Sequence, residues 1–263
     1  MRPPVTLLIG GLDPTGTAGL AVDVGICCGL GVHPAPVATV NTCQTTERFE
    51  RAVATDVDMV GAQLAAVIAD LEPQTAKLGM LWSGATAATV AKRVVGAVPS
   101  VVVDPVLVAG DGARIVSAEV DRVYIEDLIP GAWFITPNRA EASLLTGTSV
   151  SNNREALAAA EMLVDMGAMS AVVTGGASND DGHVVDAVAG QVGRGLVRSR
   201  RIDVQAIRGS GDVLSAAIAG FGATGANAAD AYALALEVAS DAISRGHQQR
   251  RAHGRPWVVY TKA

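Results

Sequence analysis

Short, nearly continuous apolar runs alternate along this chain with longer alanine-rich segments, and this alternation constrains the fold more than any other feature. Strands that are buried on both faces have such sequences, and helices between them return the chain to the same edge of a sheet. The order predicts an α/β fold, with a mostly parallel central sheet between two helical layers. The candidate strands lie at 5–10, 34–41, 75–80, 100–106, 132–136 and 169–176.

Three intervening segments carry helical spacing and terminal signals. Residues 57–71 repeat apolar side chains at helical intervals, 83–97 begin at a Ser, and 151–167 begin with Ser and Asn and stop at a Gly. Ser and Asn cap helix starts, and Gly ends helices. The segment 180–203 differs, since it alternates apolar and polar residues around a Gly- and Arg-rich stretch. It predicts a hairpin or a mobile flap near the site.

Composition limits the partners and the compartment. No linker, repeat or low-complexity tail divides the 263 residues, so we expect one domain over 1–263. The formal charge of −6 is mild and unclustered, which makes nucleic acid a poor partner. The three cysteines have no Cys-x-x-Cys spacing and predict reduced thiols in a cytoplasmic protein. The longest alanine-rich stretch, 213–229, is broken by glycines, so no membrane span is expected.

Several standard motifs are absent from the sequence. None of the three lysines, at 77, 92 and 262, follows a Gly, so the chain has no Walker phosphate loop. A Gly-x-Gly-x-x-Gly match at 220–225 ends an alanine-rich segment instead of following a strand, and we interpret it as a helix stop.

The stretch "GSGD" at 209–212 stands directly before a helical run of small apolar residues. Glycines let the backbone approach an anion, and the free N–H groups of a first helical turn stabilise negative charge. Asp212 in that turn could accept a proton from a substrate hydroxyl while the turn holds a phosphoryl group. Taken alone, however, the tetrapeptide is more typical of a turn and a helix cap.

Other loops after the predicted strands carry further candidates. The glycine-rich "GGLDPTGTAG" at 10–19 suits close backbone approach to a ligand, or an ordinary strand-to-helix turn. In "TPNRAE", Asn138 and Glu141 lie one helical turn apart and could meet one hydrated Mg²⁺, although the stretch taken alone is more typical of a helix start stabilised by Glu141. Asp104 of "DPV" ends a strand and could stabilise a metal site without binding the metal directly. In α/β sheets, ligands bind beyond these strand ends.

Together these loops follow a known order, and the chain resembles the ribokinase superfamily over nearly its whole length. It is most similar to the branch of hydroxymethylpyrimidine/phosphomethylpyrimidine kinases of thiamine biosynthesis. The motifs that carry the resemblance are "GLDPTGTAGLAVDV", "VATVNTCQTT", "AKLGML", "VVVDPVLVAGDG", "ITPNRAEASLLTG", "VVTGGAS" and "GSGDVLSAAIAG".

The resemblance implies a ribokinase-like three-layer α/β/α fold, ATP as phosphoryl donor, Mg²⁺, a homodimer, and transfer to the primary alcohol of a heterocycle. By the same matching, Gly209, Ser210 and Gly211 form an anion hole and Asp212 is the base. The implied metal and nucleotide residues are Asp104, Asn138, Glu141, Thr174, Gly176 and Gly211. The implied pyrimidine-binding residues are Gly11, Asp23, Gln44, Met80 and Val106.

Two departures keep alternatives open. The pyrimidine kinases usually have Cys at the position of Asp212, where Asp is usual in pyridoxal and sugar kinases. They also usually have Lys at the position of Thr174, which would neutralise the donor phosphates. We therefore weigh a pyrimidine kinase for the alcohol, its monophosphate or both against a pyridoxal-type or other small-alcohol kinase. A non-catalytic protein that binds nucleotide or vitamin on this fold is the third hypothesis.

Overall fold

The computed structural model describes residues 2–108, 113–176, 181–202, 207–248 and 257–258. Its nine-stranded sheet has the order β3-β2-β1-β4-β5-β6-β7-β8-β9. Strands β2 to β7 in this order pair in parallel, and β3, β8 and β9 are antiparallel additions at the two edges. The strands are Val5–Leu12, His33–Gln44, Phe49–Ala54, Thr75–Leu78, Ser100–Val103, Phe134–Ile135, Ser170–Val173, His183–Gly190 and Gly195–Arg200.

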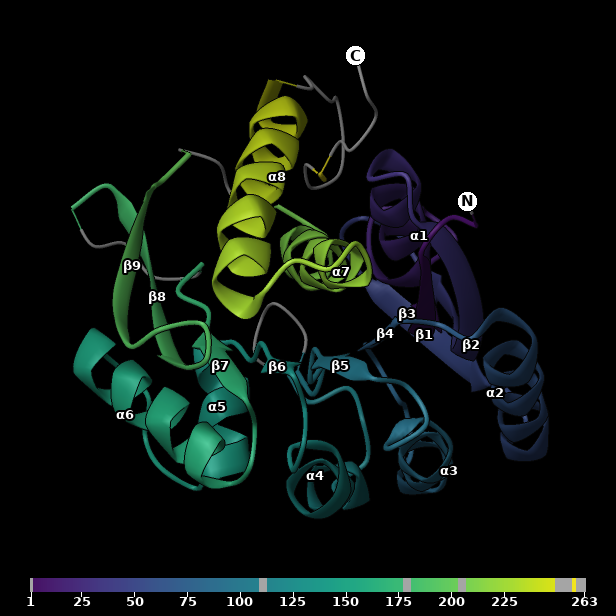
Figure 1. Ribbon diagram of the computed structural model, residues 1–263. Coiled ribbons are helices and arrows are strands. Elements are labelled where there is room, and N and C mark those ends of the chain that lie inside the picture. Colours follow the sequence, from purple (N-terminus) through teal and green to yellow (C-terminus); the bar gives the residue numbers. More distant parts are fainter. Residues whose placement is uncertain (1, 109–112, 177–180, 203–206, 249–256, 259–263) are drawn as a thin grey trace.

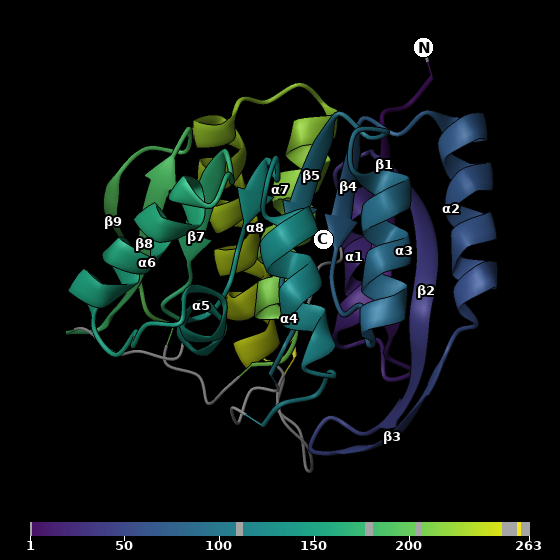
Figure 2. The same ribbon diagram turned by 90° about the horizontal axis from the view of Figure 1, so that it is seen from below.

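Helices cover both faces of the sheet, as Figures 1 and 2 show. Helices α1, α7 and α8 lie on one face, and α2 to α6 lie on the other (Figure 1). A π-helical turn, η1, follows α4 directly. The helices are Gly19–Gly29, Val57–Leu71, Gly84–Val94, Glu119–Val123, Arg139–Thr146, Asn153–Asp165, Ser210–Ala223 and Ala228–Gln248, with η1 at Tyr124–Leu128. The three-layer α/β/α prediction is confirmed.

Each face of the sheet has its own apolar core. Val102 and Val172 point to the layer of α1, α7 and α8, whereas Val101, Val103 and Val173 point to the layer of α2 to α6. This division follows from the strand period, since successive side chains face opposite sides. A strand buried on both faces therefore reads as continuously apolar. In the described part of the chain, no helix is long and apolar enough to cross a membrane.

The predicted elements agree with the structure at most positions. All six candidate strands form, and helix α2 has the predicted bounds of 57 and 71. The helix stop at 220–225 is also confirmed, because α7 ends at Ala223 and Gly225 has a φ of +93°. The segment 180–203 contains the antiparallel β8–β9 pair, although residues 180 and 203 themselves lie outside the described part.

The clearest differences from the predicted elements concern strands β6 and β3. Strand β6 spans only Phe134 and Ile135, shorter than the predicted 132–136. Strand β3 was not expected, because "FERAVA" is charged and mostly exposed and lacks a buried face. As an edge strand it needs only its antiparallel bonds to β2, so burial leaves little trace in its sequence.

Candidate active site

The candidate residues gather where the parallel strands end. Loop 13–18 follows β1, Gln44 ends β2, and Asp104 follows β5 directly. Asn138 and Thr174 form an isolated parallel bridge, so the loops after β6 and β7 are neighbours. The start of α7 meets this edge, since a Cβ on Gly209 would lie 2.5 Å from the Thr17 carbonyl oxygen. Segments nearly 200 residues apart thus form one site.

Helix α7 begins at this edge with an exposed first turn. Gly209 precedes the helix with a φ of +83°, a conformation that favours Gly. No side chain caps the helix start among the described residues, and a Cβ on Gly211 would meet nothing within 4 Å. The N–H groups of this turn are therefore able to bind an anion, as the sequence predicts for Gly209, Ser210 and Gly211.

Asp212 is held in a fixed orientation within this turn. Its Oδ2 accepts a hydrogen bond from the Gly19 backbone N–H at 3.0 Å, and its Oδ1 lies 3.1 Å from Lys77 Nζ. The carboxylate is 16% exposed, so it can still meet a substrate at the helix start. Gly19 has a φ of +60°, and a Cβ there would lie 2.4 Å from the Gly11 carbonyl oxygen. Glycine at this position therefore allows loop 13–18 to reach Asp212.

Lys77 lies beneath Asp212 at the centre of a buried charge cluster, which we define as Lys77, Asp23, Asp104 and Asp212. Its Nζ lies 3.0 Å from both Asp23 carboxylate oxygens and 3.6 Å from Asp104 Oδ2. Burial opposes its charge, but attraction to the three carboxylates raises its pKa, so the ammonium is retained. The contact with Lys77 therefore holds the Asp212 carboxylate in position. Sequence reasoning missed Lys77, although a lysine within an otherwise apolar strand was a visible signal.

Asp23 occupies a different place from the one expected. The resemblance implied that it contacts the pyrimidine, but its side chain is fully buried and paired with Lys77. Burial raises its pKa to about 8, although the charge of Lys77 acts in the opposite direction. Both carboxylate oxygens of Asp23 are occupied by Lys77, so the structure gives this residue a role in the buried cluster, and its contact with a pyrimidine stays a prediction.

Gln44 meets a residue that sequence reasoning also missed. Arg208, directly before Gly209, donates from Nη2 to Gln44 Oε1 at 3.2 Å and lies 3.4 Å from Asp13 Oδ2. Its Nε donates to Thr17 Oγ1 at 3.2 Å. The guanidinium therefore joins the end of β2, loop 13–18 and the start of α7. No local pattern identifies Arg208, because its partners lie more than 160 residues away.

The remaining predicted pyrimidine residues lie on adjoining strand ends. A Cβ on Gly11 would lie 2.6 Å from Met80 Cε, so these two residues are in contact. The Met80 carbonyl accepts a hydrogen bond from Thr39 Oγ1 at 2.6 Å. Val106 is half-buried two residues after Asp104. The structure brings Gly11 and Met80 together.

Asn138 and Glu141 form a capping box at the start of α5. The Asn138 side chain accepts from the Glu141 N–H at 3.0 Å, and Glu141 Oε2 accepts from the Asn138 N–H at 2.9 Å. Glu141 Oε1 also accepts from the Leu107 N–H at 3.2 Å. Burial, reinforced by the charge of Asp104, raises the pKa of Glu141 to about 8. The helix-start interpretation of this pair is therefore present in the structure.

Asp104, Asn138 and Glu141 offer only oxygen donors, which suit Mg²⁺. The charge of Asp104 raises the pKa of Glu141, and a nearby cation would relieve that repulsion. Within the described ranges, however, no three acidic, His or Cys side chains converge into a metal cage. The donor set fits a Mg²⁺ ion that takes most of its ligands from nucleotide phosphates and water.

Thr174 and Gly176 lie beside Asn138 at the end of β7. The Thr174 N–H donates to the Pro137 carbonyl at 2.9 Å, which fixes the loop against the start of α5. Gly175 approaches β8 so closely that a Cβ would lie 2.0 Å from the Val185 carbonyl oxygen. Asp186 accepts from the Gly175 N–H and from Tyr232 Oη, each at 2.8 Å. These contacts hold the glycine pair in place near the capping box.

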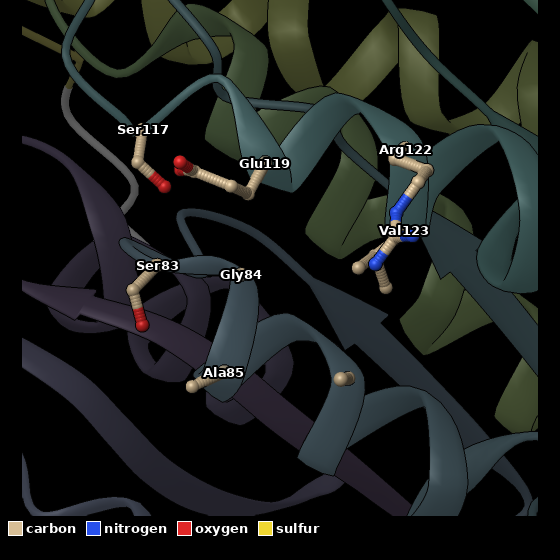
Figure 3. Close-up of a pocket in the computed structure, with 8 residues that line it drawn as sticks. Ser83, Gly84, Ala85, Ser117, Glu119, Arg122 and Val123 are labelled. Carbon is tan, nitrogen blue, oxygen red and sulfur yellow. The ribbon is translucent and has the colours of Figure 1, made fainter.

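A separate pocket of about 310 Å³ lies between helices α3 and α4 (Figure 3). Glu119 and Arg122 of α4 face the start of α3, where a Cβ on Gly84 would lie 2.9 Å from Glu119 Cβ. The pocket shares no residue with the candidate site. It is a gap in the outer helical layer, so we place the active site at the strand ends.

Comparison with known proteins gives the same picture. A family model described as phosphomethylpyrimidine kinase matches residues 13–257. A hydroxymethylpyrimidine/phosphomethylpyrimidine kinase from Synechococcus elongatus is 33% identical over 252 residues, covering 96% of this chain and 92% of that protein. An ADP complex of Bacillus subtilis pyridoxal kinase has a TM-score of 0.89 at 27% identity, covering 98% of this chain and 97% of that chain. Phosphomethylpyrimidine kinase from Clostridium difficile has a TM-score of 0.80 at 26% identity, covering 91% and 99%.

The sheet, its two helical layers and the uncapped helix start at the strand ends define a ribokinase-like kinase of small molecules. The family model that matches residues 13–257 narrows the assignment from this class of kinases to a single family. The chain belongs to the phosphomethylpyrimidine kinase family. The resemblance read from the sequence motifs is thereby confirmed.

Proposed function

We propose that the protein transfers the γ-phosphoryl group of ATP to hydroxymethylpyrimidine, to its monophosphate, or to both, in thiamine biosynthesis. One observation carries the proposal: at one edge of the sheet Asp212 contacts Gly19 directly after loop 13–18, and Arg208, which precedes the first turn of α7, contacts Gln44. A base, an anion hole and an amide that can form hydrogen bonds with a heterocycle thus lie close together. Family membership supplies the substrate class.

Each group has a part in the transfer. The first turn of α7 stabilises the negative charge that develops on the transferred phosphoryl group. The Asp212 carboxylate, oriented by Gly19 and Lys77, removes the proton from the attacking hydroxyl. Asn138 and Glu141, with Asp104 behind them, would hold Mg²⁺ that arrives with ATP, and the ion would neutralise phosphate charge.

A pyridoxal-type kinase is the second candidate. The Bacillus subtilis pyridoxal kinase has a TM-score of 0.89, against 0.80 for the Clostridium difficile phosphomethylpyrimidine kinase, and Asp212 is typical of that branch. ATP consumption with each alcohol separates the two candidates. Consumption with neither alcohol would favour the non-catalytic binding protein, which the Thr174 substitution for Lys also favours.

Gln44 is expected to set the preference between these alcohols. Its amide can pair with an aminopyrimidine, whose ring nitrogen accepts and whose amine donates, whereas pyridoxal offers a phenolic oxygen and an aldehyde. Each buried group left unpaired costs about 1–3 kcal/mol. We expect the protein to prefer hydroxymethylpyrimidine, and Gln44→Ala to reduce the ratio of kcat/KM values by about tenfold or more. Gln63→Ala, on the exposed face of α2, is the matched control. A wild-type preference for pyridoxal would contradict the assignment.

Glu141→Gln tests the metal proposal. Its amide keeps an acceptor for the capping box but, unlike the carboxyl group, cannot ionise to become a charged Mg²⁺ ligand, so the Mg²⁺ concentration for half-maximal turnover should rise by about tenfold. Glu155 of α6 occupies the same position in another Asn-capped helix start, with its carboxylate on Ser151. Glu155→Gln should leave the Mg²⁺ dependence unchanged. An equal response of both variants would restrict Glu141 to helix capping.

We also propose that the chain acts as a single-domain cytoplasmic homodimer. Family resemblance supports the dimer, and the three cysteines without paired spacing support a reducing compartment. Light scattering coupled to size-exclusion chromatography measures the mass directly. A monomer mass would remove this part of the proposal without affecting the chemistry.

A further inference from the structure

The two proposed acceptors place different demands on one site. In the first step, the alcohol oxygen attacks the γ-phosphorus of ATP, the bond to ADP breaks, and the hydroxyl proton passes to Asp212. In the second step, an oxygen of the phosphate monoester attacks in the same way and gives a diphosphate and ADP. That oxygen needs no base, because a phosphate monoester is largely deprotonated at neutral pH. Instead, the monophosphate carries roughly two negative charges, which the phosphates of ATP repel. Its binding therefore requires a cation.

Lys77 does not meet this requirement. Its side chain is 1% exposed, and its ammonium already contacts Asp23 and Asp212 at about 3 Å. Its single charge is already shared among the three carboxyl groups of the buried cluster. Asp13 adds another carboxyl group at this edge of the sheet, so Lys77 has no charge left to offer an incoming phosphate.

Arg208 offers a cation beside the helix start that receives the phosphoryl group. It directly precedes the anion hole, and its side chain is 22% exposed, so the guanidinium is accessible while its position is fixed. Nε and Nη2 are held by Thr17, Asp13 and Gln44. The bond to Gln44 places the charge between the residue expected to read the pyrimidine and the helix start that receives the phosphoryl group. A guanidinium also keeps its charge at neutral pH and has further N–H donors on Nη1 that can bind a phosphate oxygen.

Building on the proposed function, we infer that Arg208 binds the phosphate of the monophosphate substrate and is the specificity-determining residue of the second phosphorylation. Asp212 and Arg208 then serve different reactions. The carboxylate serves the neutral alcohol, which has a proton to lose. The guanidinium serves the charged acceptor, which has a charge to neutralise.

The experiment measures kcat/KM for hydroxymethylpyrimidine and for its monophosphate separately, as ADP release at saturating ATP. We compare wild type with Arg208→Gln, Arg208→Lys and Asp212→Asn, and use Arg194→Gln on the distant β8–β9 hairpin as the matched control. Arg208→Gln should lower the ratio of monophosphate to alcohol kcat/KM by about 10- to 100-fold, the worth of a charged hydrogen bond. Arg208→Lys should restore part of the ratio, and Asp212→Asn should shift it the opposite way.

Each result separates the inference from the function that it extends. An Arg208→Gln variant that loses both reactions equally, or keeps the wild-type ratio, overturns the inference and leaves the kinase intact. A wild-type protein that phosphorylates only the alcohol would also overturn the inference and leave the proposed kinase activity in place. Wild type inactive on both pyrimidines overturns the proposed function itself. The midpoint of thermal unfolding, measured for each variant, identifies any equal loss that comes from a damaged fold.

Discussion

Replacing Asp212 with Asn is expected to lower kcat for hydroxymethylpyrimidine by about 10²- to 10⁴-fold, the usual contribution of a general base. The amide has nearly the shape of the carboxylate, so it can keep an oxygen toward Lys77, but it cannot take the hydroxyl proton. ATP binding should change little, because the backbone N–H groups of α7 remain in place. Steady-state kinetics with ATP and the alcohol varied separately would measure both effects.

Asp58→Asn is the control for this substitution. Asp58 also lies in the first turn of a helix, α2, but it is exposed and distant from the strand-end loops. Its replacement removes the same charge from a helix start and should leave kcat unchanged. If Asp212→Asn kept near-wild-type kcat, the carboxylate would act only in the helix start and in the buried cluster.

The fold could be predicted from the sequence because its main signals are local. A strand buried on both faces must be apolar throughout, and the helices between strands must repeat apolar residues at helical spacing. Both patterns are visible within short windows, such as 57–71 and 100–106. Strand β3 has no buried face, and its charged sequence therefore carried no comparable signal.

The candidate site was predicted only in part, because its most constrained contacts are distant in the sequence. "GSGD" predicted the anion hole and the base Asp212 from a short window, because helix starts have local chemistry. Lys77 and Arg208 act through partners 54 to 195 residues away, so no spacing rule finds them. Asp23 was predicted as a ligand contact because it matches a pyrimidine-binding position of the family that the sequence resembles. Only its burial against Lys77 shows that it supports the site from within.

Lys77 also allows the second large prediction. Lys77→Met leaves a side chain of similar length but removes the ammonium from three carboxylates, of which Asp23 is fully buried. Removing one partner of a buried ion pair costs about 3–5 kcal/mol, because the remaining charge is uncompensated. We expect the free energy of unfolding, measured with urea near pH 8, to fall by this amount. Lys92→Met, on the exposed end of α3, should change it by less than about 0.5 kcal/mol.

The loss in Lys77→Met should depend on pH in a defined direction. Burial raises the pKa of Asp23 to about 8 and also raises the pKa of Asp104, whereas both titrate near pH 4 when unfolded. A raised pKa in the folded state stabilises the protein at low pH, and this stability is lost as pH rises toward 8. Without Lys77 the main charge that opposes this rise in pKa is lost, so the variant should lose stability more steeply between pH 5.5 and pH 8.5 than wild type. Adding Asp23→Asn to Lys77→Met should recover part of the loss at pH 8.5, because it removes one uncompensated charge. A loss that is equal at both pH values, and that Asp23→Asn does not reduce, would mean that Lys77 contributes packing and not charge.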